Sequence, residues 1–384
     1  MPDLSSWPWQ VWALVAVAAL VVGILAGHFG WGKRWTRSFG ELHPDYLAGL
    51  DYLVSEQPDR ALDMFLRLMD ANADTIETHF ALGALYRRRG EVERSIRIHQ
   101  NLLAREALPR EHREQALLAL AQDYLRAGLL DRAEGLLHQV SEVPRLRANA
   151  LAALRGVYER QHEWQQALDT FRQLSRAKAA PARSVAAHYL CELAALAVER
   201  DDISAARNFL REARREVSPF PRAALLRAQI AERQSHRELA LRLLRLALDE
   251  APVLLQEELP HLLALAGEER RDAELEALAQ TAKSRGIGEL KNLVFAAVGA
   301  NLASVAQLHS VIETVFAKDA TLGAMWRAAG DDLERAAQEL GALLAHAERY
   351  RCGECGFSGR SFYWHCPACQ SWDTFESYAM VKLR

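Results

Sequence analysis

Hydrophobic residues between His43 and Lys283 recur at the spacing of short amphipathic helices, and polar or glycine-containing turns separate the helices. The helices come in pairs that share one pattern. A small or tolerated residue is followed three positions later by an aromatic or aliphatic one, then nine positions later by Ala or Ser, and four positions later by a large side chain. Three of the five intervals between successive pairs are 34 residues. The six occurrences are Gly49, Tyr52, Ala61, Phe65; Gly83, Tyr86, Ser95, His99; Ala121, Tyr124, Ala133, Leu137; Arg155, Tyr158, Ala167, Phe171; Ala194, Ala197, Ala206, Leu210; and Ala228, Ala231, Ala240, Leu244.

This period resembles the tetratricopeptide repeat (TPR) family, and the resemblance covers residues 43–283. Small residues allow two antiparallel helices to approach closely, and the neighbouring aromatic side chain fills the space beside them. Neither helix can bury its apolar stripe alone, so successive pairs stack into a superhelical solenoid. The pattern degenerates after Pro252, and we expect residues 284–349 to form divergent helical hairpins. The predicted fold class is therefore all-α.

A charge-free apolar run, residues 9–27, lies near the N-terminus. A helix that crosses the hydrocarbon core needs about 20 apolar residues, so we expect a slightly short transmembrane helix within residues 1–32. A cleaved signal peptide is the alternative, but no Lys or Arg precedes the run. Lys33, Arg34 and Arg37 follow it, which places the C-terminal side in the cytoplasm and the N-terminus in the periplasm. Residues 33–42 form a short juxtamembrane linker, which would hold the solenoid close to the bilayer.

Four of the five cysteines form two Cys-x-x-Cys pairs, ten residues apart, within a C-terminal module of residues 350–384. Two such pairs can complete a tetrahedral site of four thiolates for Zn²⁺ or iron. So short a segment cannot build an apolar core, so the metal must supply most of its folding free energy. Two disulfides would require an oxidising compartment, whereas the predicted cytoplasmic location favours a metal, with structural zinc ahead of redox iron. The predicted ligands are Cys352, Cys355, Cys366 and Cys369.

The module resembles a rubredoxin-type zinc ribbon, with aromatic residues expected around its two knuckles. Gln370 stands after the second knuckle, where such knuckles usually carry glycine, and this departure puts the geometry of the second turn in question. His365 adjoins Cys366 and is an alternative ligand, although four thiols are available without it. We expect the ribbon to fold back on the last helices and fix the end of the superhelix, or to present a docking surface.

The formal net charge of −3 gives no general attraction to nucleic acid, so we predict no nucleic-acid partner. Motifs of metalloproteases, nucleotide-binding loops and serine hydrolases are absent from the sequence, and we predict that the chain is not an enzyme. The remaining cysteine, Cys191, is expected to be a small core residue.

Several arginines fall on the first helix of a repeat, the helix that lines the concave groove in the TPR family. A row of guanidinium groups would suit an acidic or C-terminal peptide, because Arg binds carboxylates in a bidentate manner. A solvated helix face is the alternative for each of them. The candidate groove residues are Arg87, Arg88, Arg126, Arg160 and Arg233.

The order of anchor, TPR solenoid and terminal ribbon resembles the lipopolysaccharide assembly protein B family, most specifically in YRCGECGF and YWHCPACQSW. The resemblance implies a non-enzymatic inner-membrane adaptor that brings the LpxC deacetylase to the FtsH membrane protease and responds to a membrane regulator that senses lipopolysaccharide. The alternatives are a membrane-anchored rubredoxin-like redox protein and, less favoured, a nucleic-acid-binding ribbon. The sequence leaves open whether the chain forms a homodimer.

Overall fold

The computed structural model describes residues 44–55, 57, 60–61, 63–65, 76–176, 182–302 and 306–377. The predicted transmembrane segment and the linker at residues 33–42 lie outside the described residues. Within the described ranges, no helix is both long enough and apolar enough to cross a bilayer. The chain divides into two compact units, Met1–Ala150 and Leu151–Arg384, and each is described by itself.

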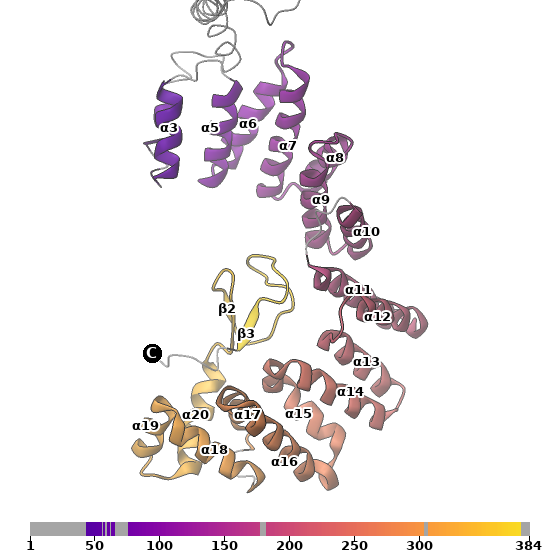
Figure 1. Ribbon diagram of the computed structural model, residues 1–384, viewed down its shortest axis with the longest axis vertical. Helices are drawn as coiled ribbons and strands as arrows, with labels where there is room; N and C mark the ends of the chain where they lie inside the picture. The colour runs from indigo at the N-terminus through magenta and orange to yellow at the C-terminus, as the bar shows by residue number, and fades with distance from the viewer. Residues whose placement is uncertain are drawn as a thin grey trace, which may run out of the picture. The chain divides into compact units, whose positions relative to one another are not determined.

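Unit 1 consists of antiparallel helices that pack in chain order, with α5, α6 and α7 lying against one another (Figure 1). Their amphipathic pattern explains the packing, because each helix buries one stripe and leaves the other to solvent. Gly90 and Gly128 end two of the tight turns with a positive φ, which glycine adopts without strain. The described helices are α3 (Pro44–Val54), α5 (Ile76–Arg88), α6 (Val92–Leu103), α7 (Arg110–Arg126), α8 (Leu130–Ser141) and the start of α9 (Arg147–Gln161).

The spacing predicted for the repeats matches the packing of helix pairs. A Cβ atom at Gly83 on α5 would lie 2.5 Å from the ring of His99 on α6, and one at Gly49 would lie 2.7 Å from the ring of Phe65. The first helix therefore needs glycine where the second helix places a ring. The Ala and Ser members of the pattern are buried as well, including Ala61, Ser95 and Ala133 at 0% exposure.

Unit 2 continues the helical hairpins and ends in a small sheet. In Figure 1, α11 and α12 form one antiparallel pair and α13 and α14 form the next. The helices of the repeats are α9, α10 (Trp164–Arg176), α11 (Arg183–Glu199), α12 (Ile203–Glu216), α13 (Pro221–Arg233) and α14 (Arg237–Glu250). They are followed by η3 (Pro252–Leu254), α15 (Leu255–Ala266), α16 (Glu268–Arg285), α17 (Ile287–Gly299), α18 (Ala306–Lys318), α19 (Ala320–Ala328) and α20 (Leu333–His346).

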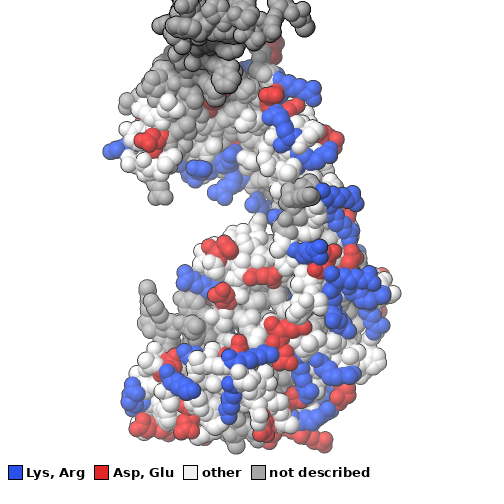
Figure 2. All heavy atoms as spheres, viewed as in Figure 1, with Lys and Arg blue, Asp and Glu red and all other residues white. Residues whose placement is uncertain are grey.

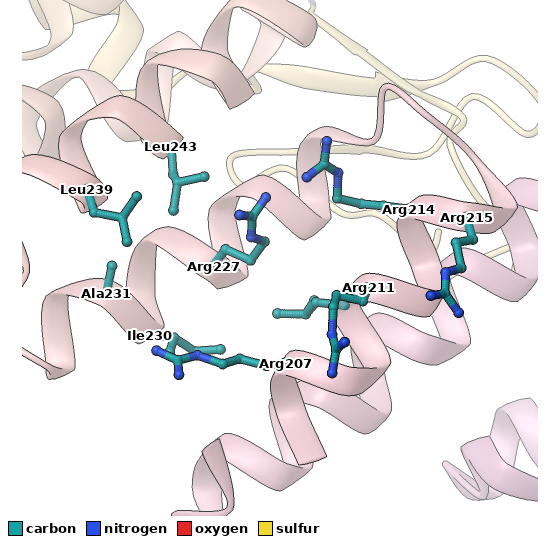
Figure 3. Close-up of a pocket in the computed structure, with 10 residues that line it drawn as sticks. Arg207, Arg211, Arg214, Arg215, Arg227, Ile230, Ala231, Leu239 and Leu243 are labelled. Atoms are coloured by element: carbon teal, nitrogen blue, oxygen red, sulfur yellow. The ribbon is translucent and has the colours of Figure 1, made fainter. Parts of the chain in front are cut away.

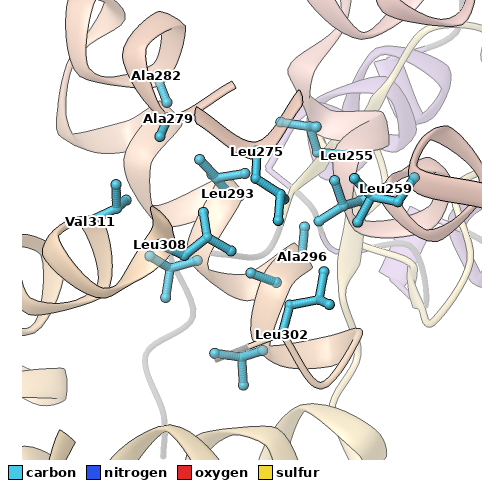
Figure 4. Packing of buried hydrophobic residues seen from close by; sticks show 14 of the residues in the cluster. Leu255, Leu259, Leu275, Ala279, Ala282, Leu293, Ala296, Leu302, Leu308 and Val311 are labelled. Atoms are coloured by element: carbon cyan, nitrogen blue, oxygen red, sulfur yellow. The ribbon is translucent and has the colours of Figure 1, made fainter. Parts of the chain in front are cut away.

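The helices after the last clear repeat share one apolar core with those before it. Leu255 and Leu259 of α15, Leu275 of α16 and Leu293 of α17 converge in this cluster (Figure 4). The same cluster extends back to Ala228 on α13 and forward to the last helix, α20. The region predicted as divergent hairpins is thus helical, and its core is continuous with that of the preceding repeats.

Three short strands close the chain: β1 (Tyr350–Cys352), β2 (Ser358–Gly359) and β3 (Phe375–Ser377). They form an antiparallel sheet in the order β2-β1-β3. In Figure 1, β2 and β3 stand beyond the end of α20, in yellow. The fold is therefore a mostly helical, TPR-like solenoid with a C-terminal ribbon, as the sequence predicts.

Candidate metal centre and its docking surface

The two cysteine pairs lie in two tight turns of the ribbon. The first turn connects β1 to β2, and the second is closed by an isolated bridge between His365 and Trp372. In each turn, a backbone amide donates to the carbonyl of the pair's first cysteine: Gly356 N to Cys352 O at 3.0 Å and Gln370 N to Cys366 O at 2.9 Å. The matching hydrogen bonds curl both turns alike and direct the thiols of each pair to one side.

The four sulfur atoms meet at one point. The Sγ atoms of Cys352, Cys355, Cys366 and Cys369 all lie within 4.8 Å of one another. The cross-pair distances from Cys352 to Cys369 and from Cys355 to Cys366 are both 3.7 Å. A tetrahedral zinc site with Zn–S bonds of about 2.3 Å has sulfur–sulfur edges of about 3.8 Å, whereas a disulfide is about 2.05 Å long. The sulfur set therefore fits a zinc ion and does not consist of disulfides.

The pKa values of the four thiols diverge. Burial raises the pKa of Cys352, but hydrogen bonds from the Thr374 hydroxyl and from the Cys355 and Glu354 amides outweigh it and lower this pKa to about 6. Hydrogen bonds to Ser371 lower the pKa of Cys369. Burial raises the pKa of Cys366. Four neighbouring thiolates repel one another, so full deprotonation requires a cation among them.

Gln370 adopts the left-handed backbone conformation that glycine would supply. Its φ is +60°, against +76° for Gly356 at the equivalent position of the first turn. The second turn therefore keeps the geometry of a metal knuckle, which resolves the question raised by the sequence. A non-glycine residue in this conformation costs about 1 kcal/mol. The Gln370 side chain accepts a hydrogen bond from Arg160 Nε at 3.0 Å, which partly offsets that cost.

His365 does not join the sulfur cluster. Its ring stacks on Trp372, with centroids 4.3 Å apart and planes at 17°, and its Nε2 lies 2.9 Å from the Gln370 carbonyl oxygen. Thr374 instead supports the ligands, because its hydroxyl lies 3.2 Å from Cys352 Sγ. The first coordination shell thus consists of four thiolates, a closed set typical of structural zinc.

The second knuckle of the ribbon docks on the helical repeats through Trp372. The indole ring of Trp372 stacks on His188 of α11, with centroids 4.6 Å apart, and meets Trp164 of α10 edge-on at 6.1 Å. The guanidinium of Arg222 on α13 lies 5.8 Å from the same ring. Each aromatic pair contributes about 0.5–1.5 kcal/mol beyond its buried area. The ribbon is therefore joined to the solenoid by a packed aromatic contact.

Glu159 on α9 accepts three hydrogen bonds on one oxygen beneath this contact. Its Oε1 atom accepts from the Trp372 indole at 3.0 Å, from the Tyr189 hydroxyl at 2.5 Å and from Arg155 at 2.6 Å. Glu159 is 4% exposed, so these donors replace its hydration. Arg155 occupies the small-residue position of its repeat, and its bonds to Glu159 and Tyr189 explain that exception.

His188 of α11 is fully buried and connects α11 and α13 to the ribbon. Its Nε2 lies 2.6 Å from Asp373 Oδ1, and its Nδ1 lies 3.2 Å from Arg222. Arg222 also pairs with Glu192 at 2.6 Å. Burial lowers the pKa of His188, and the hydrogen bond and charge of Asp373 oppose this effect only in part.

Further contacts join the ribbon to α15. The Phe362 amide donates to Glu257 Oε1 at 2.6 Å, and Gln256 donates to the Ser377 hydroxyl at 2.9 Å. Burial raises the pKa of Glu257, against the effect of the Phe362 amide. The sequence predicts that the ribbon folds back on the last helices. In the structure, its contacts reach further along the solenoid than those helices. The ribbon also contacts α9, α10, α11, α13 and α15, because its aromatic and polar residues fit the side chains of those helices.

The candidate groove arginines lie in separate places. Arg87 binds Asp123 at 2.6 Å and the Ala119 carbonyl at 3.2 Å, and Arg233 donates to the Val198 carbonyl at 3.0 Å. These bonds link first helices of neighbouring repeats. Arg160 contacts the ribbon through Gln370. Arg88 and Arg126 are exposed members of unit 1. A partner-binding role for these five residues stays a prediction.

Sequence reasoning missed Glu159, His188 and Arg222, which hold the ribbon in place. The one available signal was Arg155, a charged residue at a position where other repeats have Gly or Ala.

Cys191 is buried at 0% exposure, and burial raises its pKa to about 12, consistent with a core residue.

Comparison with known proteins agrees with this architecture. Residues 350–377 match a family described as the rubredoxin metal binding domain, and residues 78–114 and 150–183 match the tetratricopeptide repeat. The fold and the four-thiolate site define a TPR protein with a rubredoxin-type zinc ribbon.

The full sequence has curated relatives over most of its length. Lipopolysaccharide assembly protein B of Escherichia coli K12 is 31% identical over 92% of this chain and 95% of its own length. The protein of the same name from Haemophilus influenzae is 29% identical over 92% and 96%, respectively. The chain belongs to the lipopolysaccharide assembly protein B family. Among solved structures, the crystal structure of MamA aligns over 44% of this chain and 93% of its own, with 15% identity and a TM-score of 0.34.

Proposed function

We propose that this chain is a non-enzymatic adaptor that regulates lipopolysaccharide biosynthesis at the inner membrane. The family name supports the link to lipopolysaccharide, and the TPR solenoid supports a scaffold that gathers protein partners. The observation that carries the proposal is the docked ribbon. Its four thiolates would close the coordination shell of the metal, and its Trp372 is buried against the repeats, which supports a structural role for the metal and not one in catalysis.

The finer proposal concerns the partners. The chain brings an LpxC-type deacetylase to the FtsH-type membrane protease, under the control of a membrane regulator that senses lipopolysaccharide. Two proteins held on one scaffold meet at a high effective concentration, and this speeds their reaction without any new chemistry. This proposal rests on the family resemblance of the sequence.

The location is also part of the proposal. Residues 9–27 form a single-pass anchor, the N-terminus lies in the periplasm and the body lies in the cytoplasm. The charge-free run and the basic residues after it support this orientation. Cysteine labelling with a membrane-impermeant reagent in spheroplasts and in lysed cells tests it: a residue placed before the run should react from outside, and one placed after it should not.

Depletion of the protein in growing cells tests the function. The abundance of LpxC should rise when the adaptor is withdrawn, while its transcript stays constant. An unchanged LpxC level would contradict the proposal that LpxC is the partner. The scaffold would then act on a different protein. Metal analysis of the purified protein distinguishes the adaptor from the rubredoxin-like redox alternative. The adaptor should contain one zinc per chain, whereas a redox protein should contain iron.

A further inference from the structure

A cavity rich in arginine lies on unit 2, away from the metal ribbon. It has a volume of about 420 Å³, within the range of about 300–1,000 Å³ that is typical of ligand sites. Figure 2 shows basic side chains gathered over α12 and α13, and Figure 3 shows the cavity itself. It is lined by Arg207, Leu210, Arg211, Arg214, Arg215, Arg227, Ile230, Ala231, Leu239 and Leu243.

Helical spacing brings these residues to one place. Arg207, Arg211 and Arg215 are four residues apart on α12, so they share a helix face. Leu239 and Leu243 have the same spacing on α14. In Figure 3 the arginines of α12 line one side of the cavity, and Leu239, Ala231 and Leu243 lie together on the other. The cavity therefore has a basic side and an apolar side.

The basic side lacks partner carboxylates among the residues that the structure describes. Nearby arginines have them: Arg172 pairs with Glu212, Arg222 with Glu192, and Arg245 with Glu274. In the described part of the chain, the five cavity arginines form no ion pair with Asp or Glu. Two of them donate to neutral amides instead: Arg207 to the Gln234 side-chain oxygen at 2.6 Å, and Arg211 to that of Asn208.

Packing does not explain this arrangement. Like charges three or four residues apart repel one another and destabilise a helix. Burial lowers the pKa of Arg227, and the charge of Arg214 lowers it further. Burial raises the pKa of the nearby Glu250 carboxyl, and the charge of Arg214 opposes this effect only in part, so Glu250 is a weak counter-charge for the cluster at acidic pH. The cavity thus concentrates positive charge that a bound anion would neutralise.

We propose that this cavity binds an acidic peptide segment in which carboxylates flank an apolar side chain. The guanidinium groups bind the carboxylates in bidentate pairs, and the apolar side chain covers Leu239 and Leu243. Leu239 is 38% exposed and gains most from such a contact. Inorganic phosphate would use the arginines and leave Leu239 exposed, so the combined lining favours the peptide. The site lies on α12–α14 and is separate from the five groove arginines considered above.

The test uses the purified full-length protein in detergent and a fluorescein-labelled peptide of sequence Asp-Glu-Leu-Glu-Asp. Fluorescence anisotropy should show saturable binding that weakens at least tenfold in R214A/R227A and weakens with added salt. Replacing the central Leu of the peptide by Gly should weaken binding several-fold. R211A/R215A changes two exposed positions and should also weaken binding. Because exposed substitutions rarely affect folding, this second variant shows that a folding defect in the first does not account for the loss of binding. R97A/R335A removes two exposed arginines elsewhere and should bind as the unaltered protein does.

Three results would overturn the proposal. Equal peptide affinity in the cavity variants and the control would show that the cavity is not the site. Arginine-dependent binding of millimolar inorganic phosphate without binding of the peptide would make it a phosphate site. Arginine-dependent binding of vesicles of phosphatidylglycerol and phosphatidylcholine, again without the peptide, would make it a membrane-contact site. None of these measurements involves LpxC or FtsH, so the outcome is independent of the function proposed above.

Discussion

Replacement of Glu159 by Gln should weaken the attachment of the metal ribbon to the repeats. The Glu159 carboxylate accepts hydrogen bonds from Trp372 of the ribbon, from Tyr189 and from Arg155, all on one oxygen. Gln keeps an oxygen acceptor but removes the negative charge that balances Arg155. The substitution therefore isolates the electrostatic part of the contact while the shape of the side chain is preserved.

The size of the effect follows from these three bonds. A hydrogen bond to a charged group contributes about 1.5–3 kcal/mol and a neutral one about 1 kcal/mol, so each bond loses about 0.5–2 kcal/mol. Of the three, only the Trp372 bond joins the ribbon to the repeats. Arg155 keeps 23% of its side-chain surface exposed and recovers part of its hydration, which reduces the loss. We therefore expect the free energy that holds the ribbon on the repeats to fall by about 0.5–2 kcal/mol.

The rate of zinc release to a chromogenic chelator measures this change locally. If the ribbon must leave the repeats before the metal is lost, a loss of about 0.5–2 kcal/mol should speed release by about 2- to 30-fold. Glu212→Gln is the matched control, because its ion pair with Arg172 is exposed and contributes at most about 1 kcal/mol. Equal release rates for the two variants would refute the reasoning that Glu159 anchors the ribbon.

Three further predictions concern other parts of the molecule. The Cys366→Ser variant should no longer bind one zinc per chain, as measured by native mass spectrometry. Its ribbon should also become sensitive to protease, because the metal supplies the folding free energy of the ribbon. Full zinc content and unchanged protease resistance would contradict this. The pKa of His188 is lower in the folded protein than in the unfolded chain, where it is about 6.5, so folding favours the neutral ring. The contribution of this ring to the free energy of unfolding is therefore complete above about pH 6.5 and is lost as the pH falls below that value. Zinc release should therefore accelerate between about pH 6.5 and 5.5 in the unaltered protein and less so in His188→Gln, and parallel pH profiles would argue against His188. In unit 1, buried Asp123 accepts from Arg87 at 2.6 Å and Ser95 at 2.7 Å and contacts His99 at 2.5 Å. Asp123→Ala should lower the free energy of unfolding by about 3 kcal/mol in urea titrations, against less than about 0.5 kcal/mol for the exposed Asp131→Ala, and equal losses would show that the cluster is not stabilising.

Local patterns allowed much of the fold to be predicted. The repeat spacing depends on contacts between two helices close in sequence, so Gly83 and His99 could be paired from their interval alone. The four ligands could be predicted because a Cys-x-x-Cys turn places both thiols on one side without help from the rest of the chain.

The docking of the ribbon could not be predicted in the same way. Glu159 and Trp372 are 213 positions apart, and nothing local to either residue indicates the other. The arginines of the cavity lie on two successive helices, α12 and α13, and their lack of carboxylate partners becomes visible only when the helices are packed. Long-range polar contacts depend on the superhelical path of the whole solenoid, which a period of 34 residues does not determine.

The rate at which purified FtsH degrades LpxC in proteoliposomes, with and without this protein in the same membrane, tests the adaptor role most directly. We predict that the full-length protein increases the rate of LpxC loss and leaves the degradation of an unrelated FtsH substrate unchanged. An LpxC degradation rate that is the same in both preparations would contradict the account.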